Sequence, residues 1–432
     1  MSKFQIIIIV VCVVAALLAV LIFAGILPGF KKSGGSASAV PISLWGTFPK
    51  AKISNLLADF NDANRNSFQI NYTEKDPATY ENEIVNALAS GNGPDLWFLT
   101  QDLVLKHKDK VLALPFTSYP ERNFQDSFID AANVFIDAKN NNLVGLPLIA
   151  DPIVLYWNKD LFSSASISRA PLTWDEFMTD VQTLTKEDAA NNIIQSGAAL
   201  GEFSNVKNAK EILSMLILQA GNPIVQSDTL EVMLGEKGNN LLDPTESAVR
   251  FFDEFSNPGK ESYSWNIALP DSDKMFEAGS LAMYFGYAGE LDDIRAKNPH
   301  LNFDIAVAPQ IKDGKISATF GKIYALVISK NSKNIQAAYL ALLAMTAKDF
   351  SQKFSAAVSL GSARRDVLAG GASDPILSVI YKSTVMARTW LEPDPVQVSL
   401  IFKNMIESTV SGAAEISNAV QEAKNELGEL IK

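Results

Sequence analysis

The first feature of the chain is a long apolar run near its N-terminus. Residues Ile6 to Leu27 include no charged side chain, and about 20 consecutive apolar residues can span a bilayer as a helix. The apolar part of a cleaved signal peptide is shorter, about 7–15 residues, although a small-x-small cleavage site occurs at Ala37–Ala39. We therefore predict a retained transmembrane anchor at 6–27, after a short tail at 1–5, in preference to a cleaved signal.

A flexible linker is predicted at 28–39, where the chain is rich in Lys, Ser and Gly. Lipid attachment at Cys12 is not expected, because Val11 precedes this cysteine in the middle of the apolar run. We expect Cys12 to pack as a small membrane-buried hydrophobe. Charge does not orient the anchor, because Lys3 and the N-terminal amine on one side nearly balance Lys31 and Lys32 on the other.

From residue 40 the pattern becomes that of a folded α/β domain. Apolar residues at 42–45 predict a buried strand, and Ile53, Leu56, Leu57 and Phe60 have the spacing of one helix face. Alternation at 68–72 predicts a strand, and a helix at 78–90 and a strand at 96–99 follow. Strand, helix, strand, helix and strand in this order predict a parallel sheet.

The same kinds of element recur along the rest of the chain. Strand-like runs stand at 143–148 and 153–157, separated by Ala150-Asp151-Pro152. Further strands are predicted at 281–285, 303–308 and 323–328. The predicted helices lie at 174–184, 209–220, 246–256, 335–346, 398–410 and 414–431.

Composition excludes several classes of function. The chain has 432 residues, 47% of them hydrophobic and 20% charged, and a formal net charge of −11. This is globular composition, and the acidic balance argues against nucleic acid as a partner. One cysteine rules out a disulfide within the chain, and two histidines, His107 and His300, leave too few ligands for a Cys/His zinc site. We expect no cofactor and no stoichiometric metal.

The usual enzyme motifs are absent from the sequence. There is no GxxxxGK[ST] phosphate loop, no HExxH and no GxSxG. Paired carboxylates could still support hydrolysis of a glycan. Asp95, Asp151 and Glu202 are acids that the sequence alone cannot pair in space. No catalytic residue is therefore predicted.

Aromatic residues beside polar ones, at predicted strand ends and in loops, are the candidates for contact with a ligand. In open α/β sheets, ligands bind beyond the carboxyl ends of the strands. Aromatic faces can cover a sugar ring while carboxylates and amides bind its hydroxyls. Each aromatic taken alone is as readily a core residue. The candidates are Trp45, Thr47, Asp95, Asp151, Tyr156, Glu202, Trp265, Tyr284, Tyr287, Arg364 and Trp390.

Several segments resemble family 1 extracellular solute-binding proteins of ABC importers, the group that includes maltodextrin-binding proteins. The most specific are LYWNKDLF at 155–162 and TWDEF at 173–177. The others are IVNALASGNGPDLWF at 84–98, FEAGSLAM at 276–283, DIAVAP at 304–309 and GKIYALVISK at 321–330. Together they span nearly the whole chain after the linker.

This resemblance implies a two-lobed periplasmic-binding-protein type II fold (a Venus flytrap) of α/β class, here preceded by one N-terminal transmembrane helix. The expected lobes are discontinuous: 40–149 with 312–359, and 151–311 with 361–432. The resemblance points to cleft positions at Trp45–Thr47, Asp95, Asp151, Tyr284–Tyr287, Gly321–Tyr324 and Arg364. Within Tyr284–Tyr287 and Gly321–Tyr324, the site residues taken are Tyr284, Tyr287 and Tyr324. Trp265 and Trp390 match no motif of the family.

The function that the resemblance implies is a membrane-tethered, extracytoplasmic substrate-binding protein of an ABC importer. Its ligand would be a small solute, with a carbohydrate as first choice, and its protein partner a permease in the membrane. Two alternatives stay open at this point: an anchored extracellular hydrolase of glycans, and a sensor ectodomain that reports a ligand to a partner.

Overall fold

The computed structural model describes residues 39–237 and 243–431. The predicted tail, the predicted anchor at 6–27 and all but the last residue of the predicted linker lie outside the described residues. In the described part of the chain, no helix has both the length and the apolarity that a bilayer crossing requires.

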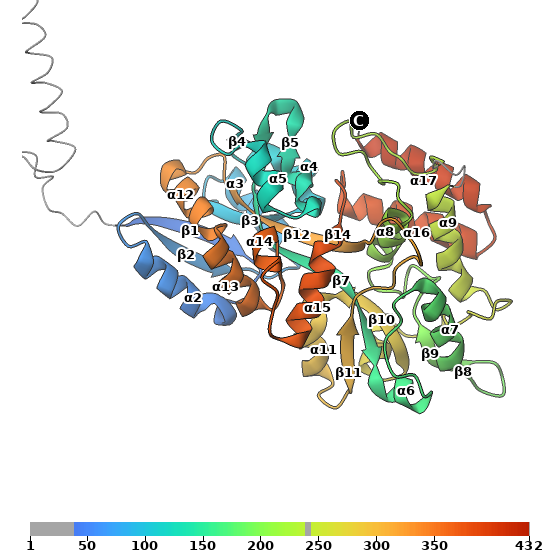
Figure 1. Cartoon of the computed structure of the whole chain (residues 1–432). Coiled ribbons are helices and arrows are strands. Elements are labelled where there is room, and N and C mark those ends of the chain that lie inside the picture. Colours follow the sequence, from blue (N-terminus) through green and yellow to red (C-terminus); the bar gives the residue numbers. More distant parts are fainter. Residues whose placement is uncertain (1–38, 238–242, 432) are drawn as a thin grey trace, which may run out of the picture.

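Two α/β lobes are built on strands of one connected sheet (Figure 1). In the first lobe the strand order is β2, β1, β3, β12 and β7. In the second lobe it is β7, β10, β9 and β8, with β11 also paired to β7. The strands are β1 (Val40–Gly46), β2 (Phe68–Glu74), β3 (Leu96–Thr100), β7 (Leu146–Asn158), β8 (Lys186–Glu187), β9 (Ile193–Ala198), β10 (Leu281–Tyr287), β11 (Phe303–Ala306) and β12 (Thr319–Ile328).

The parallel start of the first lobe is confirmed. Strand β1 pairs in parallel with β2 and with β3, and β12 is antiparallel to β3 and β7. The helices that pack in this lobe are α2 (Lys50–Ala63), α3 (Tyr80–Ala89), α4 (Val104–His107), α5 (Glu121–Ser127), α12 (Ile335–Met345), α13 (Lys348–Val358) and α14 (Arg365–Leu368). A small sheet of β4 (Leu114–Pro115), β5 (Ile136–Asp137) and β6 (Asn142–Leu143) adjoins them.

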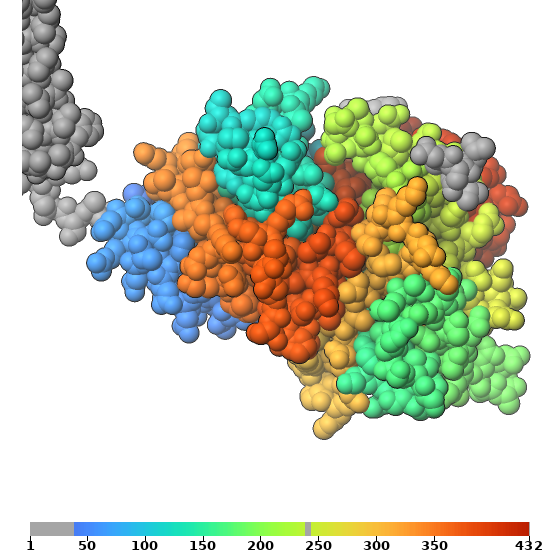
Figure 2. Space-filling view, in the orientation of Figure 1, coloured from blue at the N-terminus to red at the C-terminus, as the bar shows by residue number. Residues whose placement is uncertain are grey.

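The second lobe surrounds the other half of β7. Its helices are α6 (Lys159–Ser164), α7 (Trp174–Leu184), α8 (Ala209–Gln219), α9 (Pro244–Asp253), α10 (Ser272–Glu277), α11 (Leu291–Lys297), α16 (Pro395–Val410) and α17 (Ile416–Ile431). Helix α15 (Pro375–Val385) packs on β7 between the lobes, together with the short strand β13 (Gly361–Ser362). In Figure 2 the orange residues of α13–α15 fill the middle of the visible face.

Strands β7 and β12 carry the chain from one lobe to the other. The sequence pattern predicted two strands around Ala150-Asp151-Pro152, whereas β7 is one strand from Leu146 to Asn158. Residues 146–152 pair with β12, and 153–157 pair with β10. Pro152 has no N–H to give and stands where β7 exchanges one partner for the next, so the strand tolerates it. We call residues 149–153 of β7 and 319–322 of β12 the hinge.

The most specific sequence segments have structural reasons for their residues. Asn158 of LYWNKDLF caps α6, because its side-chain oxygen accepts hydrogen bonds from the N–H groups of Asp160 (3.0 Å) and Leu161 (3.1 Å). Thr173 of TWDEF caps α7. The indole of Trp174 donates to Gln219 at 2.7 Å, which joins α7 to α8. These segments therefore stabilise the second lobe and do not themselves form a binding site.

Candidate functional site

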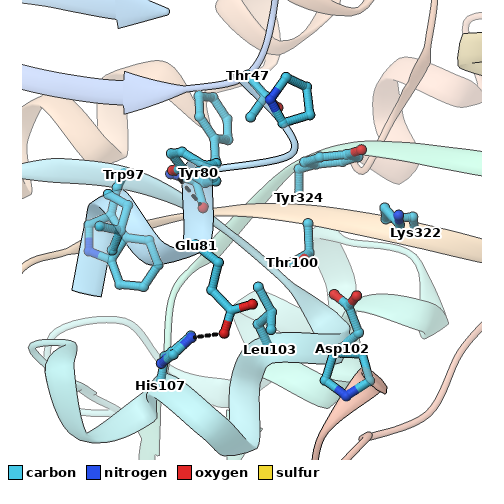
Figure 3. Close-up of a pocket in the computed structure, with 14 residues that line it drawn as sticks. Thr47, Tyr80, Glu81, Trp97, Thr100, Asp102, Leu103, His107, Lys322 and Tyr324 are labelled. Carbon is cyan, nitrogen blue, oxygen red and sulfur yellow. Dashed lines mark hydrogen bonds and ion pairs between the residues drawn. The ribbon is translucent and has the colours of Figure 1, made fainter. Parts of the chain in front are cut away.

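A cavity of about 220 Å³ lies beside the hinge, at the carboxyl ends of β1 and β3 (Figure 3). This edge of an open α/β sheet is where ligands bind in such folds. The lobe-1 wall includes Thr47, Tyr80 and Asp102, and β12 contributes Lys322 and Tyr324. Pro395, at the start of α16, contributes from the second lobe. The cavity therefore touches both lobes and the strand that joins them.

Two aromatic rings form apolar faces of this cavity. The Tyr80 hydroxyl donates to the carbonyl of Phe98 (2.9 Å) and accepts from the N–H of the same residue (3.1 Å). The ring of Tyr324 packs against Phe48, with 5.2 Å between ring centroids. Both tyrosines are thus held in place before any ligand arrives, which lowers the entropic cost of binding.

The hinge carries a lysine and a carboxylate on neighbouring strands. Lys322 on β12 stands opposite Asp151 on β7 in the strand pairing, and its Nζ lies 4.9 Å from the centre of the Tyr287 ring. Burial would lower the pKa of Lys322, but Tyr324 and the carboxylates of Asp102, Glu211 and Asp151 raise it above its usual range. Lys322 is therefore a cation at neutral pH.

Asp151 also ties the second lobe to the hinge. Its Oδ1 accepts a hydrogen bond from the N–H of Gly289 at 3.0 Å. Gly289 belongs to the turn after β10, residues Ala288–Glu290. A Cβ at this glycine would lie 2.7 Å from Asp151 Oδ2, so the close approach requires glycine. Burial raises the pKa of Asp151 to about 7.

The second lobe presents a buried ion pair and a second carboxylate. Lys210 at the start of α8 contacts Glu392 at 2.5 Å, and both side chains are at most 9% exposed. Glu211 lies 3.5 Å from the same ammonium. Burial raises the pKa of Glu392 to about 7, although Lys210 opposes this shift. The pair holds the segment that leads into α16, and hence Pro395, against α8.

Two ion pairs connect one lobe with the other. Lys106 on α4 contacts Asp394 at 3.1 Å, and Asp394 caps α16 through the N–H groups of Val396 and Gln397. Lys106 also contacts Glu81, at 3.0 Å. Elsewhere, Lys52 at the start of α2 contacts Asp292 of α11 at 2.5 Å. The lobes are therefore bridged in this conformation.

The Glu81 carboxylate also accepts from His107. The distance from His107 Nε2 to Glu81 Oε1 is 2.9 Å, as Figure 3 marks with a dashed line. Sequence analysis gave this histidine no role, whereas the structure buries it in the cavity wall. Burial lowers the pKa of His107, which favours the neutral ring, although Glu81 opposes this shift. Across the described residues, no group of three His, Cys, Asp or Glu side chains has the geometry of a metal site.

Four of the predicted ligand contacts lie at this site. Thr47 and Tyr324 line the cavity, and Asp151 and Tyr287 lie at the hinge beside Lys322. Trp45 is close by on β1, but Lys75 Nζ stands 3.8 Å from its ring centre and covers one face. Their roles in binding stay predictions.

Asp95 is placed at the wrong edge of the sheet for this site. It precedes β3, so it lies at the amino end of the strand, whereas the cavity is at the carboxyl end. Its carboxylate accepts hydrogen bonds from the N–H and hydroxyl of Ser43 (3.0 and 2.9 Å) and from Ser332 (2.6 Å). We therefore assign Asp95 to joining β1, β3 and the loop after β12.

The remaining aromatic candidates are core residues. Trp265 is fully buried and donates to Asn205 at 2.9 Å. Trp390 is 2% exposed and stacks on Phe402 of α16. Tyr156 and Tyr284 are at most 1% exposed, and their rings pack on each other at 5.8 Å. These side chains fill the core of the second lobe, Tyr156 and Tyr284 from strands β7 and β10, and Trp265 and Trp390 from loops that cover the core.

Two polar candidates are engaged outside the cavity. Arg364 makes a two-pronged ion pair with Asp366 (2.8 and 2.9 Å) and donates to the carbonyl of Thr346. Glu202 is half-buried on the second lobe, where burial and the nearby Glu407 raise its pKa. Neither side chain lines the cavity beside the hinge.

Four charged residues have no place in the sequence-based site: Asp102 in the cavity wall, and the cluster of Lys210, Glu211 and Glu392 outside it. Asp102 follows β3 directly, so the rule about strand ends would have found it. Lys322 fell within the predicted range 321–324, but only Tyr324 was selected from it. Folding brings α8 and the segment before α16 together, and this places Lys210 and Glu211 beside Glu392. No local sequence pattern predicts that contact.

Comparison with known proteins shows the protein family to which the chain is similar. A family model described as bacterial extracellular solute-binding protein matches residues 55–378. A protein of Brucella abortus named as a binding protein is 25% identical over 281 residues, which is 63% of each chain. The maltooligosaccharide ABC transporter solute-binding lipoprotein of Streptococcus pneumoniae is 24% identical over 322 residues, 70% of this chain and 69% of the relative. The Brucella alignment thus spans less than two thirds of that relative's length.

Solved structures with the same fold cover nearly the whole described chain. The cyclic α-maltosyl-1,6-maltose binding protein of Arthrobacter globiformis has a TM-score of 0.74 at 19% identity, over 91% of this chain and all of that one. A cyclo/maltodextrin-binding protein in complex with maltotetraose has a TM-score of 0.72 at 16% identity, over 93% and 99%. At these identities the likeness establishes the two-lobed α/β fold.

Proposed function

The chain belongs to the family of bacterial extracellular solute-binding proteins, and from this premise we propose that it binds a carbohydrate in the cavity beside the hinge and delivers it to an ABC importer. The family is one of binding proteins, and the relatives include receptors named for maltodextrin and maltooligosaccharide. The single observation that carries the proposal is the composition of the cavity: two fixed tyrosine rings facing a set of charged hydrogen-bonding groups.

This composition suits a sugar for physical reasons. A sugar ring has an apolar CH face, which Tyr80 and Tyr324 can cover. Its hydroxyls need both donors and acceptors around the ring edge, and the cavity offers Thr47, Asp102 and Lys322. A purely apolar ligand would leave these charged groups without partners, at a cost of about 1–3 kcal/mol each.

Binding would stabilise the closed arrangement of the lobes. The cavity has walls on both lobes, so a ligand gains contacts on closure that it lacks in the open state. A ligand shifts such an equilibrium only by its differential affinity for the two states. The closed form would then present one surface to a permease, the partner that this family of proteins implies.

The tether is the second part of the proposal. We infer from the sequence that residues 6–27 anchor the protein in the cell membrane, with the binding domain outside the cytoplasm. A tether of this kind raises the effective concentration of the receptor near its permease. Cell fractionation tests it: the full chain should sediment with membranes and resist a carbonate wash. Release of a mature protein that starts after residue 39 would overturn the anchor and leave the binding function standing.

Binding itself is tested with residues 40–432 and a panel of neutral, amino and acidic mono- and oligosaccharides. Ligand binding raises the unfolding temperature by mass action, and calorimetry on each positive compound gives its dissociation constant. Tyr324→Ala should weaken binding at least tenfold, whereas Tyr339→Ala, on the surface helix α12, should leave it unchanged. Lack of a stabilising sugar in the panel, or chemical conversion of the sugar, would refute the proposal.

A further inference from the structure

We propose that the sugar taken by this cleft carries a protonated amine, that is, an amino sugar with a free ammonium group. This inference rests on the proposed carbohydrate function and narrows its ligand class. It follows from the charges that the two lobes bring to the hinge and from polar atoms there that lack partners.

Carboxylates outnumber cations around the hinge. Four acids gather there: Asp102 from the first lobe, Asp151 from the hinge, and Glu211 and Glu392 from the second lobe. Two lysines face them, and Lys210 is already engaged with Glu392 and Glu211. Only Lys322 remains for Asp102 and Asp151, and it makes no ion pair with either within 4 Å. The pKa values of Asp151 and Glu392 are about 7, so both carboxylates are partly ionised near neutral pH, and the cavity floor becomes negative as pH rises through this value.

Three buried oxygens without partners lie in or near the cavity wall, and one of them, on Asp102, belongs to a residue that lines the cavity. Asp102 Oδ1, Tyr287 Oη and Glu392 Oε1 are inaccessible to solvent and have no hydrogen-bond partner among the described residues. Asp102 lines the cavity, and Tyr287 lies under Lys322. An unsatisfied buried acceptor is costly, so each such atom calls for a donor. Figure 3 shows the Asp102 carboxylate directed into the cavity, on the same side as Lys322.

An ammonium group would supply both a positive charge for the carboxylates and hydrogen-bond donors for the oxygens without partners. It has three N–H donors and no acceptor, and its hydrogen bonds to carboxylates are about twice as strong as neutral ones. A hydroxyl supplies one donor and leaves the charge imbalance as it is. A uronate or phosphate on the sugar would meet Asp102 and Glu211 with the same sign of charge, and like charges brought together select against such a ligand.

The experiment compares matched pairs of sugars on the domain 40–432 at pH 7, where Asp151 and Glu392 are partly ionised. Glucosamine, galactosamine and mannosamine are each paired with the parent hexose and with the N-acetylated form, and the β-1,4 dimers of glucosamine and glucose extend the set. We expect the amine to bind at least tenfold more tightly than its neutral partner. Asp102→Asn and Glu211→Gln should each remove most of that preference, whereas Asp349→Asn, an exposed carboxylate on α13, should not.

Each outcome has one reading. If a neutral or N-acetylated sugar binds as tightly as its amine, or if both variants keep the full preference, the amino-sugar inference is overturned and the carbohydrate function survives. Tight binding of a uronate overturns it as well. If none of these sugars binds, the amino-sugar inference is overturned, and the broader panel of oligosaccharides decides whether the carbohydrate function stands. Because the substitutions keep side-chain shape, a melting temperature equal to that of the parent domain shows that the variants fold.

Discussion

Lys106 on the first lobe and Asp394 on the second are joined by an ion pair of 3.1 Å. Asp394 immediately precedes Pro395, which lines the cavity, and it also caps α16. The pair therefore joins the two lobes directly beside the cavity. Both side chains are about a third exposed, so solvent weakens the attraction.

Lys106→Met tests this pair. The variant should release ligand about two- to fivefold faster, because a partly exposed pair contributes about 0.2–1 kcal/mol to the closed state. Raising the salt concentration should speed release from the parent protein and have less effect on the variant. Stopped-flow dissociation at low and high salt measures both effects. Lys353→Met is the matched control, since Lys353 pairs only with Asp349 on the same helix; equal salt dependence in all three proteins would argue against the role.

Loss of the Lys210 ammonium should destabilise the second lobe. Lys210→Met leaves Glu392 buried without its counter-charge, which costs about 3–5 kcal/mol. The pKa of Glu392 is already raised to about 7 by burial. Its contribution to stability is present at low pH and is lost as pH rises through this value. The deficit of the variant should therefore grow between pH 5.5 and 8, as urea unfolding would measure.

The double variant Lys210→Met with Glu392→Leu is its control. Replacing both charges with apolar groups removes the uncompensated charge, so most of the lost stability should return at pH 8. If the double variant is as unstable as Lys210→Met alone, the loss comes from packing and not from the buried carboxylate.

Asp151 should make stability depend on pH near neutrality. Its folded pKa is about 7, above its ordinary value, because burial disfavours the charged form. The contribution of Asp151 to the free energy of unfolding is thus greatest below about pH 4 and is lost as pH rises through 7. At about 1.4 kcal/mol per pKa unit, the loss is up to about 4 kcal/mol. Asp151→Asn keeps an acceptor for Gly289 and removes the titration, so its unfolding free energy should change less between pH 5 and 8. A profile identical to the parent protein would refute the assignment.

Trp265→Phe should lower stability and leave ligand affinity unchanged. The indole is fully buried and donates to Asn205, so the variant loses a hydrogen bond and strands its acceptor, at about 1–3 kcal/mol. Thermal unfolding and calorimetry with the bound sugar separate the two effects. A loss of affinity equal to that of Tyr324→Ala would place Trp265 in the cleft, contrary to the structure.

The sequence was a good guide to the elements and a partial guide to the site. Periodicity places α7 at 174–184 as observed, because its apolar residues follow one helix face. Strand ends also pointed to Thr47, which lines the cavity, and its role in binding remains a prediction. The sequence does not show at which end of a strand an acidic residue lies. Asp95 lies at the amino end of β3, whereas the cavity is at the carboxyl end. Trp265 misled because a loop that covers a core needs large apolar residues just as a binding loop does.

Charged residues that meet only in the folded state were beyond the reach of the sequence. Glu392 and Lys210 are 182 positions apart, and nothing in either neighbourhood indicates that both are buried. The two-lobed fold followed from the resemblance, and the limits of the two lobes remain a proposal. The sequence around Pro152 predicted a break between two strands. The structure has one strand there, because β7 changes its pairing partner at Pro152, and such a change is visible only in the assembled sheet.

The position of β12 between β3 and β7 has a consequence for how the protein is made. The ribosome must reach about residue 328 before the first lobe has its central strand, and by then most of the second lobe has been synthesised. Until that moment β3 and β7 are open strand edges, which can pair with the wrong chain. The N-terminal lobe cannot be completed first, so a holding factor that delays folding until the chain is outside would act on a polypeptide of more than 300 residues.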